Sequence, residues 1–544
     1  MKPIDVVNQF YMKYGEDEAA CAKAYLSNNN HNQDLNINNH IKRIAVYHSV
    51  MKFGGIGRVI SLMIPIYVGM NYEVILITEE ISDEDYEIPS SVKRFTIVNS
   101  SDIKNGIKAY KERAKELERI LTQEKIDLLI HHGVHLPFSV YDIILAKLMG
   151  IYTVAERHQV FTEEFCRIND LFFTQLEIFK IVDKLVVLSS MDERYWRSLR
   201  VDARYIENPF NTSLENIQND LSTENIVWIG RLAINQKQYL DVLDIAKEVI
   251  IKKPYAKILM YGSGTSEDIE QLNSAIKEKG LEEKVVFCGY ETNVNKIYKN
   301  ARIHLVTSAY EAFPMGIYES RICGIPLVMY ELPYLELLKE KKGYIASAHG
   351  DIEDMAKNIC MILDNKDVEE RLRAEARESI NSFSSDIIYD KWKKLFHEIE
   401  QGKKDVNGSE EFGVILQTIH KHFSIAQKRY NSLLWSYEQE KVVYHVNKGI
   451  KAGKEIVICP YGMVGKKVKK MINEKGLNEA YIIDNTLSKY DSQIKSLDEI
   501  KKRDCSNMFF VICTEQRKIK QLFYEEFRTL TSENNIVCYD DEIK

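Results

Sequence analysis

Short apolar runs that alternate with amphipathic helices constrain the fold of this chain more than any other feature of its sequence. Arg43–Tyr47 is the first of these runs, and the pattern repeats with a helix between successive runs. Strands that are apolar along their whole length are buried on both faces, which is typical of parallel sheets with crossover helices. The other main predicted strands are Val74–Thr78, Ile126–Ile130, Ile151–Ala155, Lys184–Leu188, Asn225–Ile229, Lys257–Tyr261, Ile303–Thr307, Leu327–Tyr330, Glu455–Cys459 and Tyr481–Asn485. We therefore predict doubly wound α/β domains, which bind ligands at the carboxyl ends of their strands.

Changes in composition place the domain boundaries within the 544 residues. Residues 28–39 contain seven asparagines and residues 211–224 are polar, so both segments are predicted linkers. The predicted order is a helical and Asn-rich N-terminal extension over residues 1–40, a Rossmann-like domain over 41–210, a second over 225–400, a helical spacer over 401–450 and a small Rossmann-like domain over 451–544.

Composition excludes several classes of protein. Hydrophobic residues make up 45% and the net charge is −7, so the chain can form apolar cores and its charge does not call for nucleic acid as a partner. Nine scattered cysteines without a C-x-x-C pair argue for the reducing cytosol. The N-terminus is too acidic for a secretory signal, and the apolar run Val59–Met70 is too short to span a bilayer. We expect a cytoplasmic protein whose membrane contact, if any, is peripheral. The charged helix Lys104–Lys125 is interpreted as a solvated face or, alternatively, a docking surface for anionic lipid or a polymer acceptor.

Two carboxylates bracket the turn after the strand Ile303–Thr307. Glu311 precedes a predicted helix that Pro314 can begin, and Glu319 lies on that helix. Their spacing allows a separation of about 12 Å at most along the axis, which suits the two ends of a long ligand. The free N–H groups of the first helical turn lie between them and favour an anion. A nucleotide sugar has this arrangement of hydroxyls at both ends and a diphosphate between.

The segment Glu311–Glu319, followed by Cys323-Gly-Ile-Pro326, resembles the E-x7-E signature of the group 1 retaining glycosyltransferases. These are GT-B enzymes related to glycogen synthase, so the resemblance implies two facing Rossmann-like domains with the donor in the cleft. It implies that Glu311 reaches the donor sugar and Glu319 the ribose. The other residues that it assigns to the donor are Phe313, Pro314, Met315 and Gly316. It also implies that the helix Phe383–Ile399 crosses back to the first domain.

A second match is the Gly-Arg-Leu step at Arg231, with Lys237 six residues later. It resembles the basic loop of the same family, although the loop is one residue longer than usual and Gln238 replaces the usual glycine. A departing nucleoside diphosphate accumulates negative charge, which an arginine and a lysine can stabilise without a metal ion. The alternative is an ordinary surface pair.

Three further sites follow strand ends. Gly55, in the turn Gly54-Gly-Ile-Gly57, resembles the first glycine-rich loop of the family, which meets the donor diphosphate or the acceptor. His158 resembles the family histidine that contacts the sugar near the reacting carbon. Tyr290 is a candidate neighbour of the base. The clustered histidines His131, His132 and His135 suggest a metal, but we see no carboxylate at ligand spacing and place them at the rim of the acceptor cleft.

The last hundred residues begin again like a nucleotide-binding domain. Gly462 and Gly465 follow the strand Glu455–Cys459, and Asp484 ends the next strand. Such glycines permit a tight turn, and such an acid can hold a ribose. These three residues form a candidate accessory nucleotide site, with a ligand-free scaffold as the alternative.

We predict a metal-independent, retaining hexosyltransferase that moves a sugar from a nucleotide-sugar, with a UDP-sugar favoured, to a hydroxyl of a glycan, lipid-linked or protein acceptor in surface polysaccharide or glycan synthesis. No cofactor beyond that co-substrate is expected, and self-association stays open. The alternatives are a nucleotide-sugar epimerase on the same fold and a GT-B scaffold subunit without turnover. Product analysis with donor alone separates the first alternative from a transferase.

Overall fold

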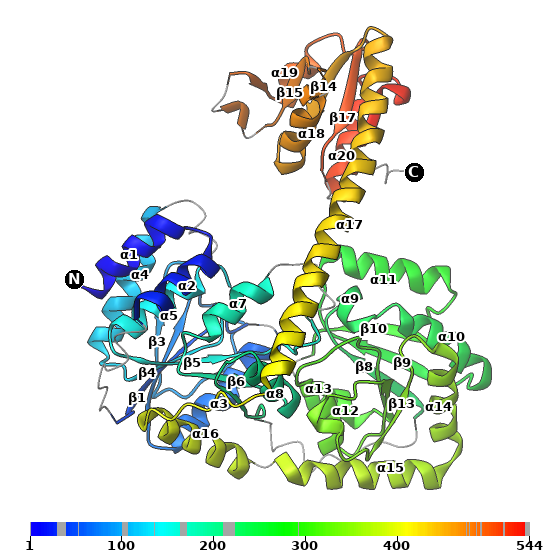
Figure 1. Ribbon diagram of the computed structural model, residues 1–544. Helices are drawn as coiled ribbons and strands as arrows, with labels where there is room; N and C mark the ends of the chain where they lie inside the picture. Colours follow the sequence, from blue (N-terminus) through cyan, green and yellow to red (C-terminus); the bar gives the residue numbers. More distant parts are fainter. Residues whose placement is uncertain are drawn as a thin grey trace. The chain divides into compact units, whose positions relative to one another are not determined.

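The protein is described from a computed structural model that covers residues 2–29, 40–52, 54–100, 107–134, 136–163, 171–209, 223–291, 293–383, 385–474, 476–477, 479–485, 487–489, 492–514 and 517–538. The chain divides into two compact units, Met1–His420 and Lys421–Lys544 (Figure 1). Residues 30–39 of the predicted linker 28–39, residues 211–222 of the predicted linker 211–224 and the predicted rim residue His135 lie outside the described residues.

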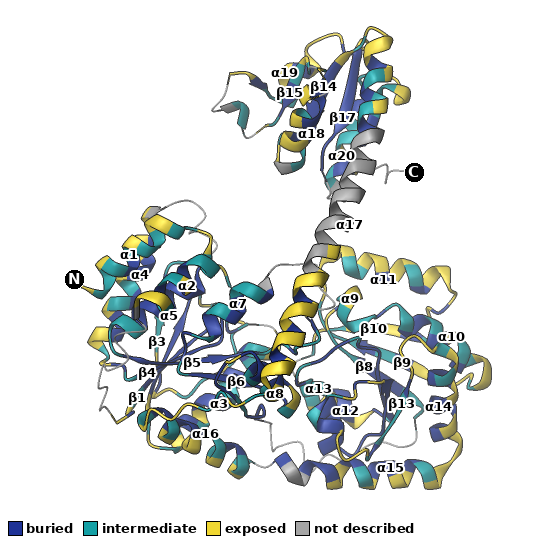
Figure 2. Cartoon of the chain, in the orientation of Figure 1, coloured by how far each residue is buried: buried dark blue, intermediate teal, exposed yellow. Residues whose placement is uncertain are grey.

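The first sheet of unit 1 has seven parallel strands in the order β3-β2-β1-β4-β5-β6-β7. Its strands are β1 (Arg43–Tyr47), β2 (Glu73–Thr78), β3 (Lys93–Thr96), β4 (Leu128–His131), β5 (Tyr152–Glu156), β6 (Lys184–Val187) and β7 (Ala203–Tyr205). The helices of this half are α1 (Pro3–Tyr14), α2 (Glu18–Asn29), α3 (Gly55–Gly69), α4 (Ile107–Gln123), α5 (Ser139–Leu148), α7 (Leu171–Phe179) and α8 (Ser190–Ser198). Burial on both faces explains why its central strands are apolar along their whole length (Figure 2).

Different helices cover the two faces of this sheet. One core joins it to α1, α2, α4, α5, α7 and α8. The other core joins it to α3 and to α16 (Ser385–Glu400), in which Trp392 packs edge-on against Tyr67. Helix α16 therefore belongs to the core of the first sheet although it follows the second sheet in sequence.

The second sheet of unit 1 has six parallel strands in the order β10-β9-β8-β11-β12-β13. They are β8 (Asn225–Ile229), β9 (Lys257–Tyr261), β10 (Val285–Gly289), β11 (Ile303–Val306), β12 (Leu327–Tyr330) and β13 (Tyr344–Ser347). Its helices are α9 (Ile234–Lys237), α10 (Asp241–Lys252), α11 (Ser266–Glu278), α12 (Val294–Lys299), α13 (Met315–Ile322), α14 (Ile352–Asp364) and α15 (Lys366–Glu378). Helices α10, α11 and α14 pack on one face, and α12 and α13 on the other.

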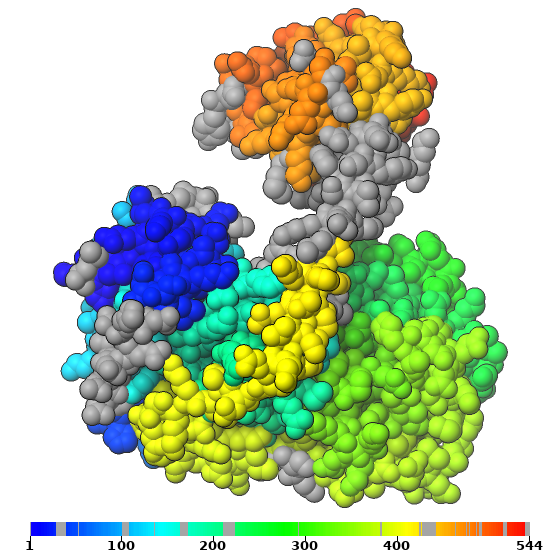
Figure 3. Space-filling model, in the orientation of Figure 1, coloured from blue at the N-terminus to red at the C-terminus, as the bar shows by residue number. Residues whose placement is uncertain are grey.

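The N-terminal helices are part of the first domain's surface. Helices α1 and α2, blue in Figure 3, lie against α4, α5 and α7. Tyr11 stacks on Tyr110, with 3.8 Å between ring centroids. The Glu18 carboxylate accepts the backbone N–H groups of Phe138 and Val140 at 2.7 and 3.0 Å, at the start of α5. A carboxylate at a helix N-terminus satisfies N–H groups that have no partner within the helix.

The charged helix in Lys104–Lys125 is not simply a solvated face. Helix α4 buries Arg113, which is 3% exposed and pairs with Glu79 at 2.8 Å and Asp142 at 2.6 Å. The solvated-face interpretation was wrong for this residue because charge content alone does not reveal which charges meet a buried partner. Across the described residues, no helix combines the length and the apolar composition that a membrane crossing requires.

Helix α17 (Glu410–Lys451) begins in unit 1 and continues into unit 2. Unit 2 holds a five-stranded parallel sheet in the order β16-β15-β14-β17-β18. Its strands are β14 (Glu455–Cys459), β15 (Tyr481–Ile483), β16 (Ile494–Lys495), β17 (Met508–Ile512) and β18 (Ile536–Cys538), and its other helices are α18 (Met463–Glu474), α19 (Leu497–Lys501) and α20 (Arg517–Arg528). The predicted fold class is confirmed: two Rossmann-like parallel sheets, followed by a smaller one.

Candidate active site

The turn after strand β11 carries two buried carboxylates. Strand β11 ends at Val306, and helix α13 begins at Met315 with Pro314 as its N-cap residue. Glu311 lies in the turn and Glu319 on the helix, and they are only 5% and 3% exposed. Carboxylates are rarely buried to this degree unless each has a partner, so the partners define the chemistry of the site.

Three residues hold Glu311 in place. The Nζ atom of Lys237 forms an ion pair with its carboxylate. The Ser308 hydroxyl donates to the same carboxylate at 2.7 Å, and the backbone N–H of Glu311 donates to the Tyr334 hydroxyl at 3.1 Å. Glu311 therefore has a fixed position and faces the basic loop that follows β8.

The basic loop, residues 231–237, is joined to the Glu311 turn by hydrogen bonds as well as by the ion pair. The Thr307 hydroxyl donates to the Lys237 carbonyl at 2.7 Å, and the Ala309 N–H donates to the Gln236 carbonyl at 2.8 Å. Arg231 reaches the same loop by donating to the Gln236 side chain at 3.3 Å, and Arg231 is exposed. The structure thus brings Arg231, Lys237 and Glu311 together, with the arginine open to a ligand.

Gln238 occupies the position where the resembling family has glycine. Its φ and ψ are 46° and 47°, in the left-handed region. Glycine adopts this conformation freely, whereas a side chain makes it unfavourable by roughly 1–2 kcal/mol. The turn that ends α9 and directs Lys237 is therefore retained here at a cost in stability.

A close approach of two glycines joins the neighbouring strand ends. A Cβ on Gly262, after β9, would lie 1.7 Å from the carbonyl oxygen of Gly230, after β8. No residue with a side chain fits this contact. The two turns can therefore pack directly against each other.

Glu319 is paired with a residue from the other half of unit 1. Arg58, in the first turn of α3, places its Nη2 2.5 Å from Glu319 Oε1. Burial raises the pKa of Glu319 to about 7, and the Arg58 guanidinium opposes that rise. Helix α3 begins at Gly55, with Gly54 in a positive-φ conformation before it. The structure therefore brings the predicted glycine loop and the predicted ribose carboxylate to the same place.

Tyr290 also meets the first half of unit 1. Its hydroxyl lies 2.7 Å from the hydroxyl of Tyr86. Burial raises the pKa of Tyr86, so that hydroxyl stays protonated at neutral pH. With Arg58 and Glu319, this pair forms a second polar contact between the two halves.

The predicted donor-lining residues differ in what their side chains do. Phe313 is buried in the core, edge-on against Tyr318 at 5.5 Å, so it anchors the turn from below. Met315 packs against the cores of both halves. A Cβ on Gly316 would lie 3.6 Å from the ring of His304, which is ordinary contact. Burial lowers the pKa of His304 to about 3, so this ring is neutral beneath α13.

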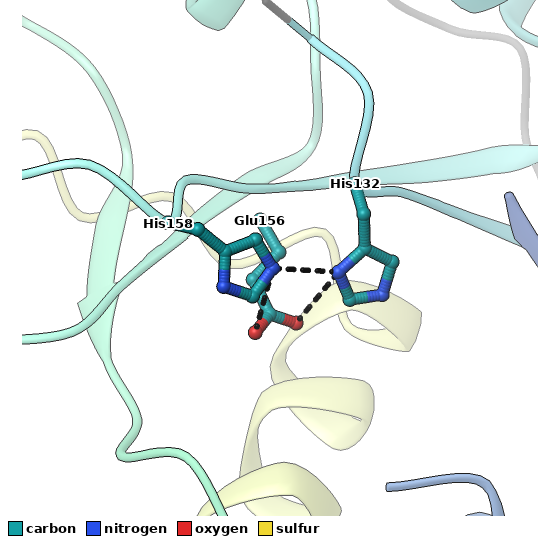
Figure 4. A group of neighbouring side chains, drawn as sticks. All are labelled: His132, Glu156 and His158. Atoms are coloured by element: carbon teal, nitrogen blue, oxygen red, sulfur yellow. Dashed lines mark hydrogen bonds and ion pairs between the residues drawn. The ribbon is translucent and has the colours of Figure 1, made fainter. Parts of the chain in front are cut away.

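His158 lies in a buried cluster (Figure 4). The Nε2 atom of His158 is 2.9 Å from Nδ1 of His132, and Glu156 lies beside both rings. Two sequence interpretations were wrong here: His131 and His132 are 2% and 1% exposed and do not line a rim, and a carboxylate does join the histidines. The sequence concealed it because Glu156 comes from the adjacent strand β5, 24 residues after His132.

The accessory residues lie in unit 2, apart from these groups in the chain. A Cβ on Gly465 would meet the Pro460 carbonyl oxygen at 2.4 Å, whereas one on Gly462 would have nothing within 4 Å. The Asp484 carboxylate accepts the backbone N–H of Leu487 at 2.9 Å. Close packing thus explains why a glycine is needed at position 465. One carboxylate oxygen of Asp484 is used to cap the neighbouring turn.

Sequence reasoning missed Arg58, Tyr86, Ser308 and Glu156. A signal existed for two of them, since Arg58 directly follows the glycine turn and Ser308 follows a strand end. Tyr86 and Glu156 gave none, because their roles depend on contacts between segments far apart in sequence.

Both halves of unit 1 match family models of known proteins. Residues 53–214 match the family model described as Glycosyltransferase Family 4, and residues 223–365 match the one described as Glycosyl transferases group 1. A poly(ribitol-phosphate) alpha-N-acetylglucosaminyltransferase of Staphylococcus aureus (strain COL) is 30% identical over 202 residues, which cover 35% of this chain and 40% of that protein. The chain thus matches less than half the length of this relative.

Solved structures support the same fold. HepE of Anabaena, in complex with UDP and glucose, aligns with a TM-score of 0.55 and 16% identity, over 66% of this chain and 100% of HepE. TarM aligns with a TM-score of 0.54 and 15% identity, over 65% of this chain and 98% of TarM. These likenesses confirm the predicted GT-B fold.

Proposed function

The two halves of unit 1 are glycosyltransferase domains of the family 4 and group 1 families, and from this premise we propose that the chain transfers a sugar, with retention, from a nucleotide-sugar to a hydroxyl acceptor. The observation that carries the proposal is the set of bonds that joins the Arg231 loop to the Glu311 turn. It offers two cations and one carboxylate at the carboxyl ends of neighbouring parallel strands, β8 and β11.

The two basic residues act on the leaving group. As the bond between sugar and diphosphate breaks, negative charge develops on the phosphate oxygens, and fixed cations stabilise this charge more than that of the ground state. Arg231 is exposed and can give a planar, bidentate contact. Lys237 is paired with Glu311 without a donor, and its Nζ can turn to the phosphate when one binds. No divalent cation and no cofactor is needed for this step.

The two carboxylates orient the donor. Glu311 accepts from sugar hydroxyls, and its bonds to Ser308 and Tyr334 keep it in position. Glu319 accepts from the ribose hydroxyls most strongly in its ionised form, and Arg58 favours that form. Tyr290 lies where the base leaves the ribose, and Tyr86 covers it from the other half. Holding the reacting groups in the correct orientation is a large part of catalysis when no covalent intermediate with the enzyme forms.

The relatives suggest the class of substrates. HepE is solved with UDP and glucose, and the Staphylococcus aureus relative acts on poly(ribitol-phosphate) with N-acetylglucosamine. We infer a UDP-sugar donor and a surface-polymer or glycan acceptor for this chain. The cytoplasm supplies nucleotide-sugars, so we place the reaction there, with a lipid-linked acceptor brought by peripheral contact with the inner face of the membrane.

The test is transfer by the purified full chain. UDP-glucose and UDP-N-acetylglucosamine are offered with poly(ribitol phosphate), poly(glycerol phosphate) or no acceptor, and released UDP and the product anomer are measured. We expect UDP release that depends on an acceptor and on Arg231, with the donor's anomeric configuration kept in the product. Epimerised donor without any acceptor, or donor binding without transfer to any of them, would contradict the proposal.

A further inference from the structure

The cluster of His132, Glu156 and His158 is built from two adjacent strand ends. His132 follows β4 and Glu156 ends β5, and the pairing of His131 with Ala155 sets the next residues side by side. His158 comes two residues after Glu156, and its ring faces the His132 ring with the Glu156 carboxylate beside both (Figure 4). The three side chains are 0%, 4% and 8% exposed. The positions are therefore fixed by the sheet.

The donor atoms face one another at the distances of a shared ligand. His132 Nδ1 lies 2.9 Å from His158 Nε2, and Glu156 oxygens lie 3.7 and 3.6 Å from these two atoms. In a tetrahedral zinc site with bonds of about 2.0–2.2 Å, neighbouring ligand atoms are about 3.4 Å apart. The observed separations lie on both sides of that value, so small movements of the side chains complete the geometry.

The hydrogen bonds available do not satisfy this carboxylate. Glu156 Oε2 is buried and has no hydrogen-bond partner among the residues that the structure describes. A proton on Glu156 would remove the charge but would not supply the missing hydrogen-bond partner. A carboxylic acid would still need an acceptor within about 3 Å, and the imidazole nitrogens at 3.6 and 3.7 Å are too far. A cation between the three atoms meets all of them at once.

We propose that His132, Glu156 and His158 bind one Zn²⁺ ion. Two imidazoles and one carboxylate form a donor set typical of zinc sites that keep a fourth position open, whereas Mg²⁺ and Ca²⁺ take oxygen ligands. None of the three ligands belongs to the Arg231 loop or the Glu311 turn, so the ion is separate from the groups assigned to the diphosphate.

The ion fixes the ends of β4 and β5 relative to each other. It orients the His158 ring and leaves a coordination position for water or a hydroxyl at the edge of the sheet where ligands of this fold bind. The site does not depend on the proposed transfer reaction, and it is tested by metal content and not by activity.

The experiment uses the full chain without a histidine tag, produced in zinc-supplemented medium and desalted. Metal analysis is expected to give about one zinc per chain, which falls at least about tenfold in Glu156→Gln and in His132→Asn. His349→Asn, a change of an exposed histidine, is the matched control and keeps the zinc. Circular dichroism establishes that each variant is folded. Zinc below about 0.1 per folded wild-type chain, or equal zinc in wild type and Glu156→Gln, overturns the proposal.

A second measurement decides the matter if the variants do not fold. Zinc is removed from the wild-type chain and replaced by Co²⁺, whose visible absorption distinguishes tetrahedral from octahedral coordination. The proposal predicts a tetrahedral spectrum that saturates at one equivalent, together with a thermal midpoint that rises with added zinc. An octahedral spectrum or an unchanged midpoint overturns it.

Discussion

The second sheet of unit 1 and the sheet of unit 2 begin in the same way, yet their strand-end turns do different work. Both have glycines after their first strand, at Gly230 in one and Gly462 in the other. In unit 1 the turns converge: Gly230 touches Gly262, and Lys237 pairs with Glu311. In unit 2 the glycine with a tight contact, Gly465, packs against its own turn.

Glycine spacing alone therefore does not define a nucleotide site. A glycine that permits close packing of a helix and a glycine that admits a phosphate look alike in sequence. What distinguishes the unit 1 site is charge that several strand ends bring together, with Arg231 exposed and the carboxylates Glu311 and Glu319 buried.

The largest effect is expected from removing Arg231, which tests whether the nucleotide site lies in unit 1. We expect Arg231→Ala to lower kcat/KM at least about 30-fold, because it removes about 2 kcal/mol of transition-state stabilisation from the leaving group. Lys237→Ala is expected to do the same, with a further loss of stability because it leaves Glu311 unpaired. Steady-state kinetics at subsaturating donor measures both.

Asp484→Asn in unit 2 is the matched control for these variants, and it is expected to keep kcat/KM within about twofold. If Asp484→Asn abolished donor binding while Arg231→Ala did not, the nucleotide site would belong to unit 2.

The next largest effect tests whether close packing explains why position 465 in unit 2 is a glycine. We expect Gly465→Ala to destabilise unit 2 by about 1–3 kcal/mol, since its Cβ would meet a backbone oxygen at 2.4 Å. Gly462→Ala points into open space and is expected to change stability by less than about 0.5 kcal/mol. Hydrogen exchange of β14 and α18 in the full chain measures both. Equal stability of the two variants would mean that Gly465 is not held by packing.

The pH dependence of donor binding sharpens the role of Glu319. Its pKa is raised to about 7 by burial, above the usual 4.5. Between pH 4.5 and about 7 the folded state therefore binds this proton more tightly than the unfolded chain does. The stability that comes from this carboxyl is present below pH 4.5 and is lost as the pH rises to about 7. Donor affinity is expected to rise with pH instead, because the ionised carboxylate accepts from the ribose hydroxyls more strongly than the neutral acid. We expect donor affinity to fall about tenfold from pH 8 to pH 6 in calorimetric titrations.

Two variants check the assignment of that titration. Glu319→Gln is expected to bind donor weakly at every pH, and Arg58→Gln to move the midpoint to higher pH because the opposing guanidinium is gone. An unchanged profile in Glu319→Gln would assign the titration to another group.

The smallest expected effect concerns the backbone of the basic loop. Gln238→Gly relieves a left-handed conformation, so we expect it to stabilise the protein by up to about 1 kcal/mol. Lys247→Gly, at an exposed position inside α10, is the control and is expected to cost about 1 kcal/mol. Thermal unfolding compares the two. Equal destabilisation by both changes would show that the loop conformation carries no strain.

Much of the fold follows from local sequence. The apolar runs specify buried parallel strands, and the segment around Glu311 specifies its own strand, turn and helix. The short edge strand β3, with no fully buried residue, lacks that signal. Contacts between distant segments had to come from the structure, because Arg58 with Glu319 and Glu156 with His132 depend on how strand ends align. At Gln238 the local sequence is misleading, because a glutamine rarely adopts the left-handed conformation that this residue has.

The most direct test of the central claim is a calorimetric titration of the full chain with UDP in buffer free of added divalent cations. The account predicts saturable binding that weakens at least about tenfold in Arg231→Ala and is unchanged in Asp484→Asn. Binding that appears only with Mg²⁺, or that is equally tight in Arg231→Ala, would contradict it.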